Sequence, residues 1–138
     1  GQMTTNITSF NYAAVREALT NESVASEVLK MRDAFAKRAD LIMQRLGEIP
    51  GVTCPKPTGA FYVFPDVSAL FGKASPGGKA INNAVDLSEA LLDEANIAFV
   101  PGDDFGGCGG NHVRISFACS EEQINAGMDR FKAFVEAM

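Results

Sequence analysis

One apolar stripe of about seven helical turns limits how this chain can fold more than any other feature of its sequence. Apolar residues recur at steps of three and four between Val24 and Ile49, which places them on one face of a helix. The stripe consists of Val24, Val28, Met31, Phe35, Ala39, Ile42, Leu46 and Ile49. The sequence therefore predicts a long helix that begins at Asn21 or Glu22 and is ended by Pro50-Gly51. A short helix over residues 11–19 is expected before it.

Strand-like and loop-like segments follow the long helix. Residues 52–58 should be extended, because each proline biases its predecessor away from the helical region. "GAFYVFP", residues 59–65, predicts a strand that is apolar on both faces and is closed by Pro65. Residues 72–85 are small and polar, which predicts a mobile surface loop, either a tolerated insertion or a lid.

The remaining segments predict two more helices and two more strands. Asp86 with Glu89 resembles a capping box, so a helix is expected from there to about Ala95, followed by the apolar run "IAFV". "HVRISFA" predicts the last strand, and Ser120 with Gln123 should cap a final helix. The order helix, strand, helix, strand, strand, helix predicts an α/β domain: a small sheet of three to four strands with helices packed on it.

Composition excludes several classes of function. The chain has 138 residues, the size of one domain, and a formal net charge of -5 without a cluster of Lys and Arg, which argues against a nucleic-acid surface. Three scattered cysteines and a single histidine are too few well-spaced ligands for a zinc site and favour a reduced, cytoplasmic setting. No apolar run approaches the length of a membrane span, and no leader resembles a signal peptide. The opening "GQMTTNITSF" reads like the inside of a longer chain, so we expect a piece of a larger protein.

The stretch "VPGDDFGGCGG" is rich in glycine but does not fit a phosphate-binding loop. Neither a G-x-G-x-x-G pattern nor a following Gly-Lys-Ser/Thr is present, and Asp103 and Asp104 would repel a phosphate. The stretch is instead predicted to be a turn with positive φ angles that joins two strands.

Arg114 stands in the middle of the otherwise apolar strand "HVRISFA". Alternation places His112, Arg114 and Ser116 on one face and Val113 and Ile115 on the other. A cation taken out of water needs an anion, and a guanidinium can hold a flat carboxylate through two parallel hydrogen bonds. The alternative is an exposed arginine on the solvent side of a half-buried sheet. For His112, an ordinary surface histidine is expected.

The residues show no constellation for nucleophilic or acid/base catalysis. A Ser-His-Asp arrangement would need a Gly-x-Ser-x-Gly elbow, which the chain lacks. The acidic pairs Asp93-Glu94 and Glu121-Glu122 lie in predicted helices, where adjacent side chains diverge. From the residues alone, the chain is predicted to be a carboxylate-binding α/β domain.

Three segments together resemble one enzyme family. "VPGDDFGGCGGNHVRISFACS" is similar to the C-terminal signature of class I/II pyridoxal-phosphate aminotransferases. "PTGAFYVFPDVS" resembles the strand that opens that family's small domain, and "QMTTNITSFNYAAVREAL" resembles the segment after the cofactor lysine in bacterial aspartate aminotransferases. The three occur in the family's order, so the resemblance covers essentially the whole chain.

The resemblance implies a fold and a set of roles. Residues 1–20 would link from a large cofactor-binding domain, and residues 21–138 would form the small domain of a fold-type-I aminotransferase. Arg114 would bind the substrate α-carboxylate. Four further residues would approach the substrate pocket or shape the turn behind it: Gly59, Ala60, Tyr62 and Phe105. Thr4 and Thr5 would lie near the dimer neighbour's cofactor site.

The resemblance also shows what the chain lacks. The family's Ser-Lys motif, the Asp that pairs with the pyridinium nitrogen and the Asn/Tyr pair at the cofactor ring have no counterpart among these 138 residues. Pyridoxal 5'-phosphate is therefore expected as the cofactor of the full-length enzyme and not as a covalent ligand of this chain. Alone, the chain is expected to be inactive. The implied partners are amino-acid and 2-oxo-acid substrates, the chain's own large domain and a second subunit.

The substrate class remains open within this resemblance. The N-terminal segment favours an aspartate:2-oxoglutarate enzyme, while aromatic, prephenate or alanine specificity is the alternative. A function of a different class is a free-standing, non-catalytic module that binds a carboxylate or a partner with the same fold.

Overall fold

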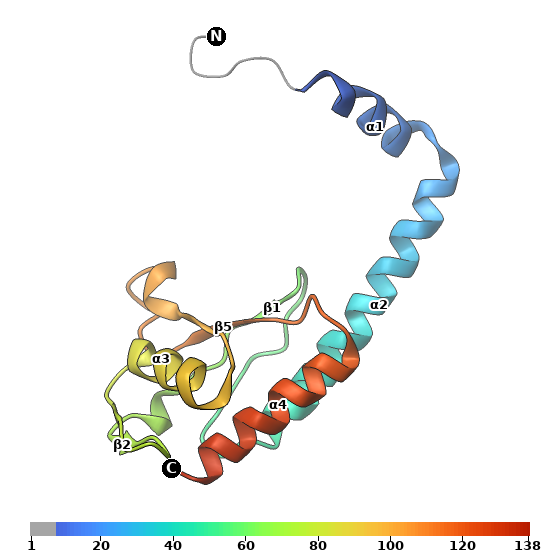
Figure 1. The fold of residues 1–138 in the computed structure, drawn as a ribbon. Coiled ribbons are helices and arrows are strands. Elements are labelled where there is room, and N and C mark those ends of the chain that lie inside the picture. Colours follow the sequence, from blue (N-terminus) through green and yellow to red (C-terminus); the bar gives the residue numbers. More distant parts are fainter. Residues whose placement is uncertain (1–7) are drawn as a thin grey trace, which may run out of the picture. The chain divides into compact units, whose positions relative to one another are not determined.

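Residues 8–138 are described by a computed structural model of the chain (Figure 1). The expected roles of Thr4 and Thr5 fall outside these residues. The chain divides into two compact units, and the boundary lies between Ala34 and Phe35. The predicted boundary between residues 20 and 21 concerns a full-length enzyme and stays a prediction. None of the described helices is both long enough and apolar enough to cross a membrane.

Both helices predicted near the start of the chain are present. Helix α1 spans Ser9–Thr20 and α2 spans Glu22–Gly47. The side-chain oxygen of Asn21 accepts a hydrogen bond from the backbone N–H of Ser23 at 2.9 Å, which caps α2. The apolar stripe of α2 is buried only in its second half: Ile42 and Leu46 are buried, whereas Val28 is 50% exposed.

A three-stranded antiparallel sheet forms the centre of the unit that begins at Phe35. Its strands are β1 (Tyr62–Val63), β4 (Val100–Pro101) and β5 (Val113–Ser116), in the order β1-β5-β4. Because β5 lies in the middle, it pairs with β1 on one side and with β4 on the other. Helices and this small sheet confirm the predicted fold class, although the strand expected over residues 59–65 is shorter.

The core lies against one face of β5. Val113, Ile115 and Phe117 are buried there, as the alternation predicted. Helix α4 (Glu121–Glu136) runs beside the end of α2 (Figure 1), where Arg45 donates a hydrogen bond to Asn125 at 3.0 Å. The core also contains Val63, Val67, Leu70, Ile81, Leu87, Leu91, Ile124, Met128 and Phe131. Burial of these side chains, at roughly 1.5–3 kcal/mol each, is the main favourable contribution to folding.

One of the two predicted helix caps is correct and one is wrong. Ser120 and Gln123 form a full capping box at the start of α4. Helix α3 spans Ala84–Ala95, and its cap is Asn83, whose side chain accepts a hydrogen bond from the backbone N–H of Asp86. The helix begins before Asp86 because asparagine is as good an N-cap as aspartate, and the Asp86 carboxylate reaches back to the N–H of Asn82.

The segment predicted as a mobile loop is a β-hairpin. Strand β2 (Lys73–Ala74) pairs antiparallel with β3 (Ala80–Ile81), and the Ile81 side chain is fully buried. Glu94 of α3 fastens the tip: its carboxylate accepts hydrogen bonds from the Ser75 hydroxyl at 2.6 Å and from the Gly77 N–H at 2.8 Å. Small polar residues suit this tip because a serine hydroxyl and a glycine backbone N–H serve as hydrogen-bond donors to Glu94.

The glycine-rich stretch folds into a tight turn between β4 and β5. A 3-10 helix over Gly102–Phe105 begins it, and Gly106 has a φ of 113°. Gly102 and Gly109 approach so closely that a Cβ atom on either would overlap the carbonyl oxygen of the other. The turn therefore requires glycine at these two positions, and the predicted positive φ is present at Gly106.

We expect Gly109→Ala to destabilise the chain by about 1–3 kcal/mol, because the added methyl group forces two backbone segments apart. Urea denaturation of the chain measures this change. Gly107→Ala is the matched control, because a Cβ atom there meets nothing within 4 Å. A similar loss in both variants would contradict the close approach.

Glu94→Ala should free the hairpin tip without unfolding the chain. Amide exchange at Gly77 is expected to accelerate by about tenfold or more, because its N–H loses a charge-assisted acceptor worth roughly 1.5–3 kcal/mol. Hydrogen exchange followed by NMR measures this, with Asp93→Ala as the control on the neighbouring exposed position. Unchanged exchange at Gly77 would show that Glu94 does not hold the tip.

Candidate functional site

The candidate site is the face of β5 opposite the core. Arg114 lies on that face and is half-buried, between the buried side chains of Val113 and Ile115 along the strand. Its backbone is fixed on both sides, because Val100 of β4 is its direct partner and the adjacent Ile115 pairs with Val63 of β1. The central strand thus presents the guanidinium from a rigid position.

Two aromatic rings enclose the guanidinium. The Arg114 Cζ atom lies 4.6 Å from the centre of the Tyr62 ring and 4.5 Å from that of Phe105. Tyr62 comes from β1 and Phe105 from the turn after β4, so the two rings reach Arg114 from opposite sides of the central strand. Each contact is a cation–π interaction, worth about 0.5–2 kcal/mol depending on solvent access.

A second pair of rings supports the first. Phe64 meets Phe105 edge to face, at 5.9 Å and 90°, and the His112 ring is stacked on Phe64 at 4.8 Å and 6°. His112 is half-buried, and its Nδ1 atom is buried without a hydrogen-bond partner among residues 8–138. The expectation of an ordinary surface histidine is therefore wrong, because the Phe64 ring covers one of its faces.

Asp66 lies next to these rings and is fixed by Ser68. Its carboxylate accepts hydrogen bonds from the Ser68 backbone N–H at 2.8 Å and from the hydroxyl at 2.6 Å, and these bonds lower the pKa of Asp66. The nearby His112 adds to this lowering of the pKa. Asp66 also forms backbone bridges to Thr53 and His112, which extend the sheet beyond β1. Its carboxylate is thus already engaged by neighbours other than Arg114.

The charge of Arg114 has no partner within residues 8–138. The ion pairs of this part of the chain all involve other cations. Arg45 shows the contrast: it is also half-buried, but it contacts Asp129 and Glu48, and the hydrogen bond to Asp129 raises its pKa. Arg45 therefore has its own carboxylate partners, whereas Arg114 has none within residues 8–138.

The other predicted site residues are placed less directly. Tyr62 and Phe105 are brought against Arg114, and they are 37% and 45% exposed. Gly59 and Ala60 lie in the exposed turn that leads into β1, and only chain position groups them with Tyr62. Ala60 has a φ of 57°, an uncommon conformation for a residue with a side chain. Phe64 was not singled out from the sequence, where it looks like any other apolar strand residue.

The described residues do not by themselves fit a covalently held cofactor. All six lysines of the chain lie within residues 8–138, and none is buried. Lys79 donates a hydrogen bond to Glu89, which raises the pKa of Lys79 and keeps it protonated. The same residues contain no group of His, Cys, Asp and Glu that could hold a metal ion. The three cysteines are free thiols.

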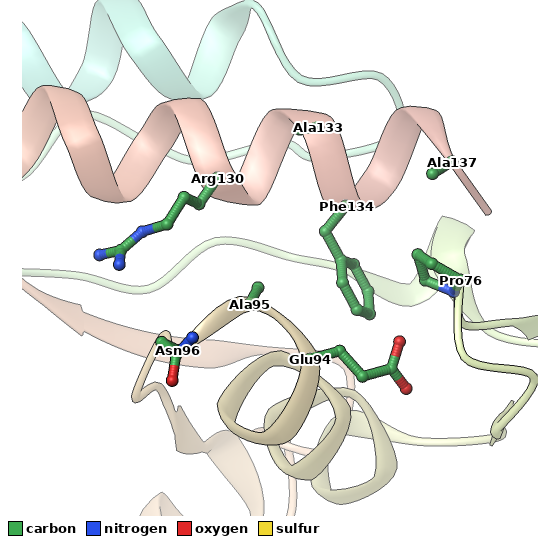
Figure 2. Close-up of a pocket in the computed structure, with 8 residues that line it drawn as sticks. All are labelled: Pro76, Glu94, Ala95, Asn96, Arg130, Ala133, Phe134 and Ala137. Carbon is green, nitrogen blue, oxygen red and sulfur yellow. The ribbon is translucent and has the colours of Figure 1, made fainter.

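A groove lies between the end of α3 and α4 (Figure 2). It is an open groove of about 370 Å³. It is lined by Pro76, Glu94, Ala95, Asn96, Arg130, Ala133, Phe134 and Ala137. Glu94 already accepts hydrogen bonds from the hairpin tip. Arg130 is therefore the one charged side chain without a partner among the described residues that line the groove.

The described residues form a small α/β domain in which a half-buried arginine contacts two aromatic rings on one face of the sheet. Comparison with known proteins gives this class a family. The sequence profile of aminotransferase class I and II matches residues 2–131, so the chain belongs to the class I and II aminotransferases. Membership implies pyridoxal phosphate in the full-length enzymes of the family.

Individual relatives agree with the family assignment. The chain is 41% identical over 135 residues to a probable aspartate/prephenate aminotransferase of Aquifex aeolicus, covering 98% of this chain and 32% of that protein. It is 39% identical over 129 residues to an aspartate aminotransferase of Streptomyces avermitilis, covering 94% of this chain and 30% of that protein. The chain thus spans about a third of the length of the curated relatives it matches.

Solved structures show the same fold. The aspartate aminotransferase of Rhizobium meliloti superposes with a TM-score of 0.88 at 35% identity, over 99% of this chain and 33% of that one. The Thermus thermophilus aspartate aminotransferase solved with maleate superposes with a TM-score of 0.72 at 36% identity, over 88% of this chain and 28% of that one. The predicted match to the C-terminal region of aspartate-type aminotransferases is confirmed.

We expect pyridoxal phosphate to label no single lysine of this chain stoichiometrically. Because all six lysines are at least partly exposed, none has the enclosed surroundings that would set it apart. Incubation, borohydride reduction and peptide mapping test this, with a full-length aspartate aminotransferase as the positive control. Complete modification at one lysine would contradict the expectation.

Proposed function

We propose that this chain is the part of a pyridoxal-phosphate-dependent amino-acid aminotransferase that binds the substrate α-carboxylate, through Arg114. The observation that carries the proposal is a half-buried guanidinium whose charge has no carboxylate partner within residues 8–138, on the rigid central strand of a family member. A guanidinium in this state is stabilised when an external anion arrives.

The chemistry of the group suits a carboxylate. Arginine presents a planar fork of N–H donors that matches two carboxylate oxygens, and such charge-assisted bonds are roughly twice as strong as neutral ones. Holding the carboxylate at two points also fixes the orientation of the amino acid, which aligns its reacting bond with the rest of the enzyme. The role of Arg114 is therefore binding and orientation, and no proton transfer is assigned to it.

The cofactor and its lysine belong to the part of the enzyme outside this chain. Pyridoxal phosphate, when bound there, stabilises the negative charge that develops at the substrate Cα atom. The absence of a buried lysine supports the proposal that the chain alone is inactive and depends on a large domain. We further propose that the full-length enzyme is a cytoplasmic homodimer, with this domain closing over the substrate to exclude water.

An aspartate:2-oxoglutarate enzyme is the proposed specificity. The names of the Aquifex and Streptomyces relatives support an aspartate donor, and the Thermus structure was solved with a dicarboxylate, maleate. Prephenate stands beside aspartate in the names of the Aquifex and Cereibacter sphaeroides relatives. Similar structures also include an aromatic aminotransferase and an alanine aminotransferase from Pyrococcus, so these donors are the alternatives to test.

Arg114→Lys in the full-length enzyme should lower kcat/KM for aspartate by about two orders of magnitude. Lysine keeps the charge but loses the two-donor fork, and charge-assisted bonds of this kind are worth roughly 1.5–3 kcal/mol each. Misplacing the carboxylate should lower kcat as well as affinity. Cofactor binding, followed by its absorbance, is expected to change little.

Two controls separate this role from a structural one. Arg130→Lys changes an exposed arginine of α4 and should leave the kinetics unchanged. An amine substrate without the α-carboxylate should react equally slowly with the wild type and with Arg114→Lys. Equal losses on aspartate and on this amine would overturn the assigned role.

A further inference from the structure

We propose that Tyr62 and Phe105 make the Arg114 site a slot for planar anions, which selects a carboxylate against a tetrahedral sulfonate or phosphonate. The inference rests on the proposed function, because it concerns the group that Arg114 binds. It adds the feature that selects anions by their shape. That feature is the pair of rings and not the arginine itself.

The two rings come from opposite neighbours of β5. Tyr62 faces Ser116 across the β1–β5 pair, and Phe105 ends the 3-10 helix that follows β4. Their ring centres lie at almost equal distances from the Arg114 Cζ atom, 4.6 and 4.5 Å. The proposed slot requires that these rings cover the two faces of the guanidinium and leave its in-plane N–H edge open to an anion.

The faces of the rings add a repulsive element. An aromatic face carries partial negative charge, so it attracts the guanidinium and repels an anionic oxygen. A carboxylate places both oxygens in the guanidinium plane and avoids the rings. A tetrahedral anion whose two oxygens accept hydrogen bonds from the same edge projects its third oxygen out of that plane, toward a ring face. Selectivity of this kind comes from disfavouring the wrong ligand as much as from binding the right one.

Neighbouring aromatic rings support both walls of the slot. Phe105 meets Phe64 edge to face, and the His112 ring is stacked on Phe64. Tyr62 contacts Phe61 at 4.6 Å between ring centres, and Phe61 is stacked on Phe35 of α2 at 5.8 Å. Both walls are therefore supported from behind, so a bulky anion cannot push them apart at no cost.

Competitive inhibition of the full-length holoenzyme tests the slot. Propionate and ethanesulfonate carry one negative charge each at neutral pH and differ in the shape of the anionic group. The measured quantity is the ratio of the two inhibition constants, sulfonate over carboxylate. In Phe105→Leu this ratio should fall at least fivefold, mainly through tighter binding of ethanesulfonate. Tyr62→Leu should act in the same direction.

Conservative variants keep the test specific. Phe105→Tyr and Tyr62→Phe retain the ring faces and should keep the wild-type ratio, which a general loss of structure would not do. An unchanged ratio in both leucine variants would overturn the slot. The same would follow if the conservative variants lowered the ratio as much as the leucine variants.

Failure of the proposed function gives a different result. If Arg114→Lys leaves propionate inhibition unchanged, Arg114 does not bind the carboxylate, and the slot proposal is also wrong. If Arg114→Lys weakens propionate binding while Phe105→Leu and Tyr62→Leu leave the ratio unchanged, the carboxylate role stands and only the slot is wrong.

Discussion

Burial of one face of β5 is the constraint on which the rest of the domain depends. Val113, Ile115 and Phe117 are buried on that face, and a strand must then turn its intervening side chains the other way. A shift of register by one residue would bury Arg114 and expose the core residues, which is far too costly to occur. The same hydrophobic contacts that fold the domain therefore also fix the direction of the Arg114 side chain.

The two half-buried arginines differ in what surrounds them: carboxylates around Arg45 and aromatic rings around Arg114. Arg45 joins α2 to α4 through Asn125 and Asp129, so its charge is used inside the fold. Arg114 is surrounded by aromatic rings, which stabilise a cation without neutralising it. A guanidinium held by rings keeps its charge, which is what the proposed role in carboxylate binding needs.

Patterns with a fixed period were predictable from the sequence, and contacts between distant residues were not. The 3.6-residue period located α2 and α4, and the alternation along β5 separated core from site. The hairpin over residues 73–81 was missed because the Glu94 carboxylate that holds its tip is distant in sequence. The rings around Arg114 were missed as a unit for the same reason: the signature identified Phe105 and Tyr62 as separate neighbours, while their common contact depends on strand order.

The opposite faces of β5 give the domain two sets of residues that can change independently in evolution. Substitutions at Tyr62 and Phe105, which are both partly exposed, alter the surroundings of Arg114 and leave the packing beneath the strand intact. Substitutions of the core residues beneath the strand affect folding before they affect the surroundings of Arg114. In a domain arranged this way, a change in the surroundings of Arg114 needs no new scaffold, because its cost is confined to a few rings above the sheet.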